Sequence, residues 1–198
     1  MDELLALDQQ LFLFLNSLHA AWLDPIMIAV SGKLTWIPLY LLIVYLVYRK
    51  QQWRGLLWFV VCAGLVILLA DRISVLAFKD IFQRLRPCHE SAIADYVYLP
   101  SGHKGGLYGF VSSHAANTFG IAVLTALFLQ KRWATLLLLI WALWVSYSRI
   151  YMGVHYPGDV LCGAILGAGI ASAIWLAARA INARLIAPKR HSKIAKNT

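Results

Sequence analysis

Charged residues are scarce in this sequence. They make up 14% of its 198 residues, against about a quarter in an average soluble domain. Hydrophobic residues make up 61%, and the mean hydropathy is +0.67. These values exclude an ordinary soluble protein and indicate an integral membrane protein, with room for a bundle of roughly five or six spanning helices.

Cysteines and carboxylates are also few. The three cysteines, Cys62, Cys88 and Cys162, are odd in number and far apart in the sequence, which argues against a disulfide framework and against a zinc site. The nine acidic residues form no cluster in the segments that we expect at the outer face. Because cations such as Mg²⁺ need several oxygen ligands, we expect no bound metal and no other cofactor.

The shortage of acidic residues leaves a formal net charge of +9. Basic residues gather in the segments 49–54, 130–132 and 184–198. Short basic loops are typical of the cytoplasmic side of a membrane protein, where they face anionic lipid. We therefore expect this charge to face a lipid bilayer and not nucleic acid. Nothing in the sequence predicts an oligomeric state.

Long apolar runs predict an all-α fold, a polytopic transmembrane helical bundle in the segment 34–183. Five spans are expected, at residues 34–48, 56–79, 114–129, 133–148 and 159–180. In the last of them, Gly163, Gly167 and Ala171 are spaced for close contact with another helix. The segment 184–198 is expected to be a basic cytoplasmic tail, with Arg184, Lys189, Arg190, Lys193 and Lys196.

The N-terminal segment, residues 1–33, has a different pattern. Between residues 4 and 18, polar side chains interrupt the apolar ones, which suits a helix lying in the membrane interface. An additional, poor spanning helix is the alternative. Asp24-Pro25 then predicts the start of a short helix that ends near Ser31-Gly32.

Three groups of polar residues interrupt the apolar pattern, and the first lies between the last two spans. It carries Arg149, His155 and Asp159. Ionisable groups at membrane depth are costly unless they have a function there. Asp159 could hold one tautomer of the His155 imidazole, and the Arg149 guanidinium suits a phosphate or carboxylate. This group predicts an anion site with a nucleophile or base at its centre.

The second group lies at the end of the span 56–79. Lys79 and Arg86 are seven residues apart, with Arg72 seven residues before Lys79, so a continuing helix would place them on one face. Snorkelling of basic side chains at a helix end is the alternative. Because like charges repel unless an anion lies between them, we favour an anion site, with Asp71 neutralising Arg72.

The third group, Ser112-Ser113-His114, opens the span 114–129. Serine is a favoured N-cap, so capping alone is the alternative. A helix N-terminus also presents free N–H groups that bind phosphate, and a histidine in its first turn could donate a proton there. With five spans, all three groups lie on the side of the membrane opposite the basic loops.

Together the motifs Lys79-x6-Arg86-Pro87, Ser112-Ser113-His114 and Ser148-Arg149-x5-His155-x3-Asp159 resemble the signatures of the type 2 phosphatidic acid phosphatase (PAP2) superfamily. That superfamily includes bacterial membrane lipid phosphatases and shares its site with the vanadium haloperoxidases. The resemblance implies an all-helical fold and metal-independent hydrolysis of a phosphate ester through a phosphohistidine. Vanadate is then expected to inhibit the protein and not to serve as its cofactor.

The resemblance also implies a role for each residue. His155 would attack phosphorus, Asp159 would orient His155, and His114 would protonate the leaving oxygen. The phosphoryl oxygens would be held by Lys79, Arg86, Arg149, Ser112 and the backbone N–H groups around Ser113. Fixed cations can stabilise the negative charge of phosphoryl transfer, as Mg²⁺ does elsewhere.

One departure concerns the second signature, which in the family usually reads Pro-Ser-Gly-His. Those letters occur at Pro100-Ser101-Gly102-His103, which offers His103 as an alternative acid. We prefer His114, because the apolar run after it predicts the required helix, whereas Gly105 and Gly106 follow His103 and break helices.

The motifs do not specify the lipid. Our leading expectation is undecaprenyl diphosphate, hydrolysed to undecaprenyl phosphate at the extracytoplasmic (periplasmic) face of a bacterial inner membrane, with loop 88–111 forming part of the headgroup wall. The alternatives are lipid A and phosphatidylglycerol phosphate. A transporter is the rival class of protein, but the charges collect at one face and no inverted repeat is visible.

Overall fold

Helices make up nearly all the regular structure of residues 2–186, which the computed structural model describes, with side chains for residues 3–181. The α-helices are α1 (Asp2–Ser17), α2 (Asp24–Ser31), α3 (Ile37–Ile73), α4 (Asp80–Phe82), α5 (Ser113–Leu129), α6 (Arg132–Tyr151) and α7 (Pro157–Ile186). Turns of 3₁₀-helix lie at Leu34–Trp36, Pro87–His89 and Ala94–Tyr96, and a π-helix at Ser74–Lys79 joins α3 to α4. The predicted all-α bundle is confirmed.

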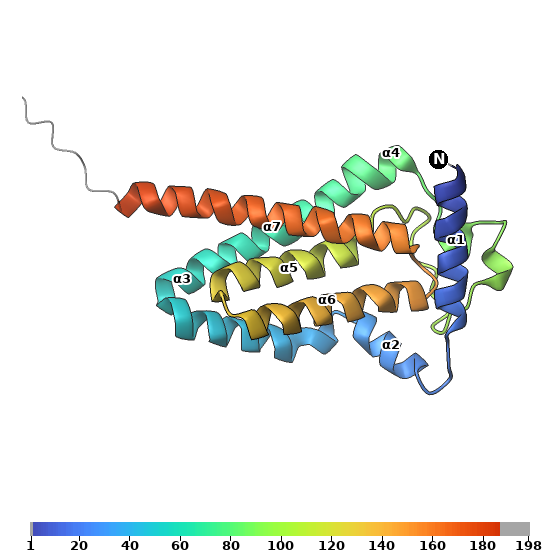
Figure 1. The fold of residues 1–198 in the computed structure, drawn as a ribbon, viewed down its shortest axis with the longest axis horizontal. Coiled ribbons are helices and arrows are strands. Elements are labelled where there is room, and N and C mark those ends of the chain that lie inside the picture. The colour runs from blue at the N-terminus through green and yellow to red at the C-terminus, as the bar shows by residue number, and fades with distance from the viewer. Residues whose placement is uncertain (1, 187–198) are drawn as a thin grey trace, which may run out of the picture.

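The longest helix, α3, folds back on itself at Gln52, where the backbone φ is 57° (Figure 1). The residues before and after this point form two arms, 37–51 and 53–73, which diverge toward the other end of the bundle. The prediction of a loop at 49–54 is therefore wrong in form, because the chain stays helical up to and beyond one sharp turn.

Three helical stretches of the described residues are long and apolar enough to cross a membrane: Leu34–Phe82, Arg132–Tyr151 and Pro157–Ile181. Ser113–Leu129 is a shorter apolar helix. The two arms of α3, together with α5, α6 and α7, occupy the positions of the five predicted spans. The number of membrane crossings itself stays a prediction.

An apolar core runs through the bundle. Its fully buried side chains include Val47 from the first arm of α3, Val66 from the second, Leu124 from α5 and Ala142 from α6. Large apolar side chains on the outer faces of α3, α6 and α7 remain exposed, Leu57, Leu136 and Ile165 among them. Such an outer surface is suited to lipid and unsuited to water.

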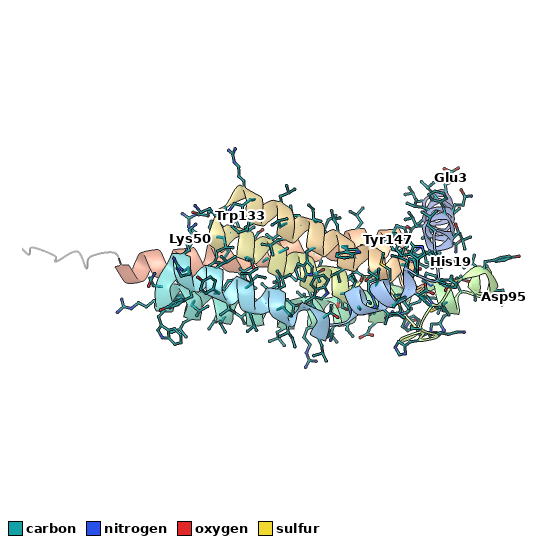
Figure 2. The ribbon with its side chains drawn as sticks, turned by 90° about the horizontal axis from the view of Figure 1, so that it is seen from below. Glu3, His19, Lys50, Asp95, Trp133 and Tyr147 are labelled. Atoms are coloured by element: carbon teal, nitrogen blue, oxygen red, sulfur yellow. The ribbon has the colours of Figure 1, made fainter. Side chains whose placement is uncertain are left out.

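Helix α1 lies across one end of the bundle instead of along it (Figures 1 and 2). It exposes Leu4 and Phe14 and buries Phe12 and Asn16. The Asn16 amide donates a hydrogen bond of 2.9 Å to the carbonyl of Tyr151 at the end of α6. Since α1 has 16 residues and spanning takes about 20, this arrangement fits the predicted interfacial helix.

Of the two expected domain boundaries, one falls between two helical elements and the other falls inside a helix. The boundary at residue 33 lies between α2 and the 3₁₀ turn Leu34–Trp36. Helix α7 continues to Ile186, past the boundary expected at 183. Most of the predicted basic tail, 187–198, lies outside the described residues.

Helices α5 and α7 pack closely through small residues. A Cβ atom added to Gly163 would lie 2.5 Å from the carbonyl oxygen of Ser112, and one added to Gly167 would lie 1.9 Å from that of Ala116. The close helix contact predicted from the glycine spacing is confirmed. It holds the first turn of α5 against the first turns of α7.

We expect Gly167→Ala to destabilise the protein by about 1–3 kcal/mol, because the added methyl group forces α5 and α7 apart. Thermal unfolding in detergent would measure this effect as a lower midpoint. Gly169→Ala is the matched control: nothing lies within 4 Å of a Cβ atom there, so this variant should be neutral or slightly more stable. Equal midpoints for the two variants would contradict the close contact.

Candidate active site

The three predicted groups of residues lie at the same end of the bundle, the end that α1 covers. One contact joins each pair of groups: Lys79 Nζ to Ser113 Oγ at 2.9 Å, Ser112 N to Asp159 O at 2.9 Å, and Arg86 Nη1 to His155 Nε2 at 3.5 Å. The structure thus brings together segments that are separated in the sequence by dozens of residues.

A buried imidazole and a buried carboxylate form the centre of this cluster. His155 lies in the turn between α6 and α7, and Asp159 lies in the first turn of α7, which begins at Pro157. Their side chains are 2% and 0% exposed, and Nδ1 of His155 lies 3.4 Å from Oδ2 of Asp159. The same oxygen accepts a 3.1 Å hydrogen bond from the backbone N–H of Tyr156, which fixes the carboxylate.

The partners of His155 determine its tautomer. Asp159 can only accept a hydrogen bond when ionised, so the proton belongs on Nδ1. Arg86 has only donors, so Nε2 must present its lone pair toward the guanidinium. The unprotonated nitrogen of the neutral imidazole therefore points toward the positive charge of Arg86.

The pKa of His155 lies well below its usual value of 6.5. Burial is the largest cause, followed by the positive charges of Arg86, Arg149 and Lys79. At neutral pH the imidazole is consequently unprotonated and able to act as a nucleophile.

Arg86 reaches this site from a loop and not from a helix face. The helix that carries Lys79 ends at Phe82, and Gln83 follows in a left-handed conformation. The expectation that Lys79 and Arg86 share a helical face is therefore wrong. Arg86 is instead held by the carbonyls of Tyr108 and Val154, at 3.3 and 3.4 Å.

Lys79 is the last residue of the π-helix, a conformation often found at functional sites. Its ammonium group donates to the hydroxyl of Ser113, which also shares a hydrogen bond of 2.6 Å with Ser74. Ser112 is the N-cap of α5: its hydroxyl accepts from the backbone N–H of Ala115 at 3.4 Å. The backbone N–H groups of Ser113 and His114, in the first turn, have no acceptor within the helix.

Arg149 comes from the last turn of α6. One of its terminal nitrogens donates to the hydroxyl of Ser31, and its Nε is buried without a hydrogen-bond partner. A buried donor without an acceptor is costly, so the site lacks an acceptor at this point.

Lys79, Arg86 and Arg149 share one property. Each contacts neutral oxygens, and none forms an ion pair with a carboxylate among residues 3–181. Three mutually repelling cations without a carboxylate in direct contact form a binding site for an anion, and three donors of this kind suit phosphate.

His114 stands where this cluster opens into a groove. Arg149, His155, Lys33 and Arg86 are all close enough to act on it electrostatically. The groove has a volume of about 480 Å³ and runs between the two arms of α3 along α5. Its polar end includes Asp71, Ser113, His114 and Asn117, and apolar residues follow, Tyr40, Ile43, Val60, Ala63 and Ile67 among them.

Asp71 does not neutralise Arg72, so that expectation is wrong. The Asp71 carboxylate accepts a hydrogen bond of 2.8 Å from the amide of Asn117, across the groove. The ion pairs of the described residues do not join Asp71 to Arg72, whose side chain is exposed.

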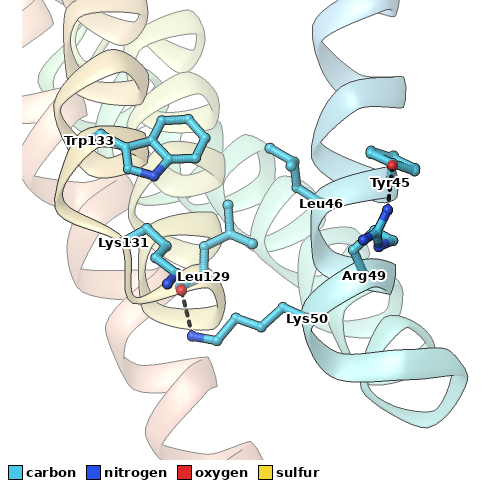
Figure 3. Close-up of a pocket in the computed structure, with 7 residues that line it drawn as sticks. All are labelled: Tyr45, Leu46, Arg49, Lys50, Leu129, Lys131 and Trp133. Atoms are coloured by element: carbon cyan, nitrogen blue, oxygen red, sulfur yellow. Dashed lines mark hydrogen bonds between the residues drawn. The ribbon is translucent and has the colours of Figure 1, made fainter.

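A second cavity, of about 460 Å³, lies at the opposite end of the bundle (Figure 3). It is lined by Tyr45, Leu46, Arg49, Lys50, Leu129, Lys131 and Trp133. Lys50 caps the end of α5 by donating to the carbonyl of Leu129. Its cations belong to the two basic turns, and its lining holds neither an imidazole nor a carboxylate, so we do not assign chemistry to it.

His103, the alternative acid, lies in an exposed loop. Its backbone N–H bonds the hydroxyl of Ser101 at 3.3 Å, and no helix begins there. His103 does not line the groove, whereas His114 does. The two histidines therefore lie in different surroundings, as the sequence analysis expected.

The loop 88–111 is only partly free to meet a ligand. Tyr98 donates to the carboxylate of Asp24 at 2.6 Å, and this bond raises the pKa of Tyr98 to about 12. Tyr98 thus anchors the loop to the N-terminal segment. Asp95, Tyr96 and Lys104 remain exposed, and a headgroup wall at these positions stays a prediction.

Two residues beside the site carried no assigned role in the sequence analysis. Arg84 contacts Asp159 at 2.9 Å, and Asp8 of α1 contacts Arg84 at 2.8 Å. The contact between Asp8 and Arg84 spans 76 residues of sequence. The sequence pointed to these two residues only weakly, because Arg84 lies two residues before Arg86 and Asp8 is one of several polar residues in α1.

Several known proteins are similar to this chain in sequence. A lipid A 4'-phosphatase of Bacteroides thetaiotaomicron is 39% identical over 180 residues, which cover 90% of this chain and 80% of that protein. A lipid A 4'-phosphatase of Porphyromonas gingivalis is 33% identical, covering 84% and 71%. An undecaprenyl-diphosphatase of Sulfolobus acidocaldarius is 28% identical, covering 85% and 77%.

A solved structure has the same fold. The crystal structure of a transmembrane PAP2 type phosphatidylglycerolphosphate phosphatase from Bacillus subtilis matches with a TM-score of 0.69 at 20% sequence identity, and the match covers 91% of this chain and 89% of that one. The PAP2 superfamily model matches residues 55–183, which include all three groups of site residues. From its sequence and its fold together, the chain belongs to the PAP2 superfamily of membrane lipid phosphatases.

Proposed function

We propose that this membrane lipid phosphatase removes a phosphate group from lipid A, by transfer of the phosphoryl group to His155. The chemistry is supported by one observation above all. A neutral, buried imidazole directs its unprotonated nitrogen toward Arg86, and Arg86 and the two nearby cations Lys79 and Arg149 lack carboxylate partners among the described residues.

The choice of lipid rests on the relatives. The two with 39% and 33% identity are named as lipid A 4'-phosphatases, whereas the undecaprenyl-diphosphatase is 28% identical. They favour our alternative substrate over the leading expectation of undecaprenyl diphosphate. We accordingly propose that the ester bond of the phosphate at the 4' position is cleaved.

In the first step, Nε2 of His155 attacks phosphorus and the bond between phosphorus and the lipid ester oxygen breaks. That oxygen takes a proton from His114, which stands at the mouth of the groove. As the imidazole gains positive charge, the carboxylate of Asp159 on Nδ1 stabilises it.

In the second step, water attacks the phosphohistidine. His114, now neutral, accepts a proton from this water, and the bond between phosphorus and Nε2 breaks. Inorganic phosphate leaves, and His155 returns to its neutral form. Lys79, Arg86 and Arg149 hold the equatorial oxygens in both steps, with the N–H groups at the start of α5 and the hydroxyl of Ser112.

The groove supports a lipid substrate entering from the side. Its apolar walls between the arms of α3 suit an acyl chain, and its polar end leads to His114. The basic turns lie at the other end of the bundle, where Figure 2 labels Lys50. By the positive-inside rule, we propose that the site faces the periplasm from a bacterial inner membrane.

Single alanine substitutions test the roles of the histidines. His155→Ala should abolish phosphate release, because the nucleophile is gone. His114→Ala should slow release by about 10²–10⁴-fold, the usual contribution of a general acid. His103→Ala is the matched control and should leave the rate unchanged. Phosphate released from detergent-solubilised lipid measures all three, and a fully active His114→Ala would contradict the assignment of the acid.

The pH dependence of kcat/KM tests the state of His155. Because the lowered pKa keeps the imidazole neutral, activity should persist as the pH falls through 6.5 and should be lost only below it. Lipid phosphates can also titrate near pH 6, so two lipids with different phosphate groups should be compared. A loss near pH 6.5 that is common to both lipids, and that stays at the same pH in Arg84→Gln, would contradict the lowered pKa of His155, because protonation of Asp159 would respond to the loss of its contact with Arg84.

A substrate panel tests the choice of lipid. We expect the highest kcat/KM for lipid A, lower values for undecaprenyl diphosphate and phosphatidylglycerol phosphate, and no effect of EDTA on any of them. Preference for undecaprenyl diphosphate would overturn the lipid A proposal. Loss of activity in EDTA would overturn the metal-independent mechanism.

A further inference from the structure

Arg84 lies beside the active site, and its guanidinium group binds other residues of the protein. Its Nη1 donates to Oδ1 of Asp159 at 2.9 Å, and its Nη2 donates to Oδ2 of Asp8 at 2.8 Å. The guanidinium also lies over the ring of Tyr156, 4.0 Å from its centroid. Both terminal nitrogens and one face of this cation are therefore used within the protein, unlike those of Arg149.

Asp8 makes a second contact that fixes α1 to α7. Its Oδ1 accepts a hydrogen bond of 2.8 Å from the backbone N–H of Gly158, in the first turn of α7. A carboxylate at a helix N-terminus is favoured by the free N–H groups and the helix dipole. The fit is close, because a Cβ atom on Gly158 would lie 2.7 Å from Oδ2 of Asp8.

These contacts bear directly on the carboxylate that orients His155. The Asp159 side chain is 0% exposed, and Arg84 is the cation that contacts it within ion-pair distance. A buried carboxylate without a cation takes up a proton or moves toward another donor. Either change would weaken the contact to Nδ1 of His155 and the stabilisation of the charged phosphohistidine.

We propose that Arg84 and Asp8 are positioning residues for Asp159, so that the interfacial helix α1 takes part in catalysis through a chain from Asp8 to Arg84, Asp159 and His155. Arg84 keeps the orienting carboxylate ionised and in place, and Asp8 keeps Arg84 in place. The inference rests on the proposed role of His155 as nucleophile.

The test measures kcat and KM for phosphate release from lipid A. Arg84→Gln should lower kcat by about 10–100-fold, as is typical when a partner that orients a site residue is lost, and should leave KM nearly unchanged. Arg84→Lys should recover part of this loss. Asp8→Asn should cause a smaller loss of the same kind.

Two further readouts separate positioning from a general loss of structure. The acid limb of the kcat profile should move to higher pH in Arg84→Gln, because Asp159 then holds a proton more readily. The double variant Arg84→Gln with Asp8→Asn should be no slower than Arg84→Gln alone, since both act through one chain of contacts.

Matched controls come from exposed residues of the same types. Glu3→Gln removes an exposed carboxylate from α1, and Arg54→Gln removes an exposed arginine near the turn of α3 at the opposite end. Both variants should keep the wild-type kcat and pH profile. If Arg84→Gln fails to fold, Arg84→Lys and Asp8→Asn still decide between the outcomes.

Three results would overturn the inference. A raised KM at unchanged kcat would mean that Arg84 binds substrate. Full activity of Arg84→Gln and Asp8→Asn would mean that the contacts are structural only, and an equal loss in Glu3→Gln would mean that α1 acts non-specifically. A wild-type protein that releases no phosphate from any lipid would instead defeat the proposed function.

Discussion

One buried imidazole has to remain neutral and correctly turned among several cations, and the rest of the site follows from that requirement. Lys79, Arg86 and Arg149 repel one another and also favour the neutral form of His155. The protein holds these three cations with neutral oxygens, which orient them without cancelling their charge. A phosphate group can then supply the missing negative charge, whereas the carboxylate of Asp159 is reserved for Nδ1.

Helix packing stabilises this arrangement, because the repulsion among the three cations has to be opposed by favourable contacts elsewhere. Helices α5 and α7 pack closely at Gly163 and Gly167. These helices carry the N–H groups and Asp159 at their first turns, and the N–H of Ser112 bonds the carbonyl of Asp159 directly. The packing of α5 against α7 thus sets the distance between the first turn of α5, where we propose that phosphate binds, and the carboxylate of Asp159.

The sequence predicted those parts of the site that are encoded within short stretches. Ser112 to His114 could be recognised because an apolar run follows it, and His155 with Asp159 because four residues separate them. The position of Arg86 in a loop could not be predicted, because the helix before it ends at the left-handed residue Gln83, without a glycine or proline at that point. Near Gln52 the reversal of the chain was predicted from the basic segment 49–54, but not that the chain stays helical on both sides of it. The role of Asp8 depends on a contact across 76 residues, which no local pattern records.

The structure also separates recognition of phosphate from recognition of the lipid. On the proposed mechanism, buried residues bind the phosphoryl group, the apolar walls of the groove meet the acyl chain, and exposed residues such as Tyr96 and Lys104 meet the headgroup. On this proposal the motif residues determine the reaction and not the choice of lipid, which fits the similarity of this one chain to relatives named for lipid A and for undecaprenyl diphosphate. Because α1 covers this end of the bundle and contacts α7 through Asp8, the headgroup binding and the alignment of Asp159 that we propose would both take place beside the same interfacial helix.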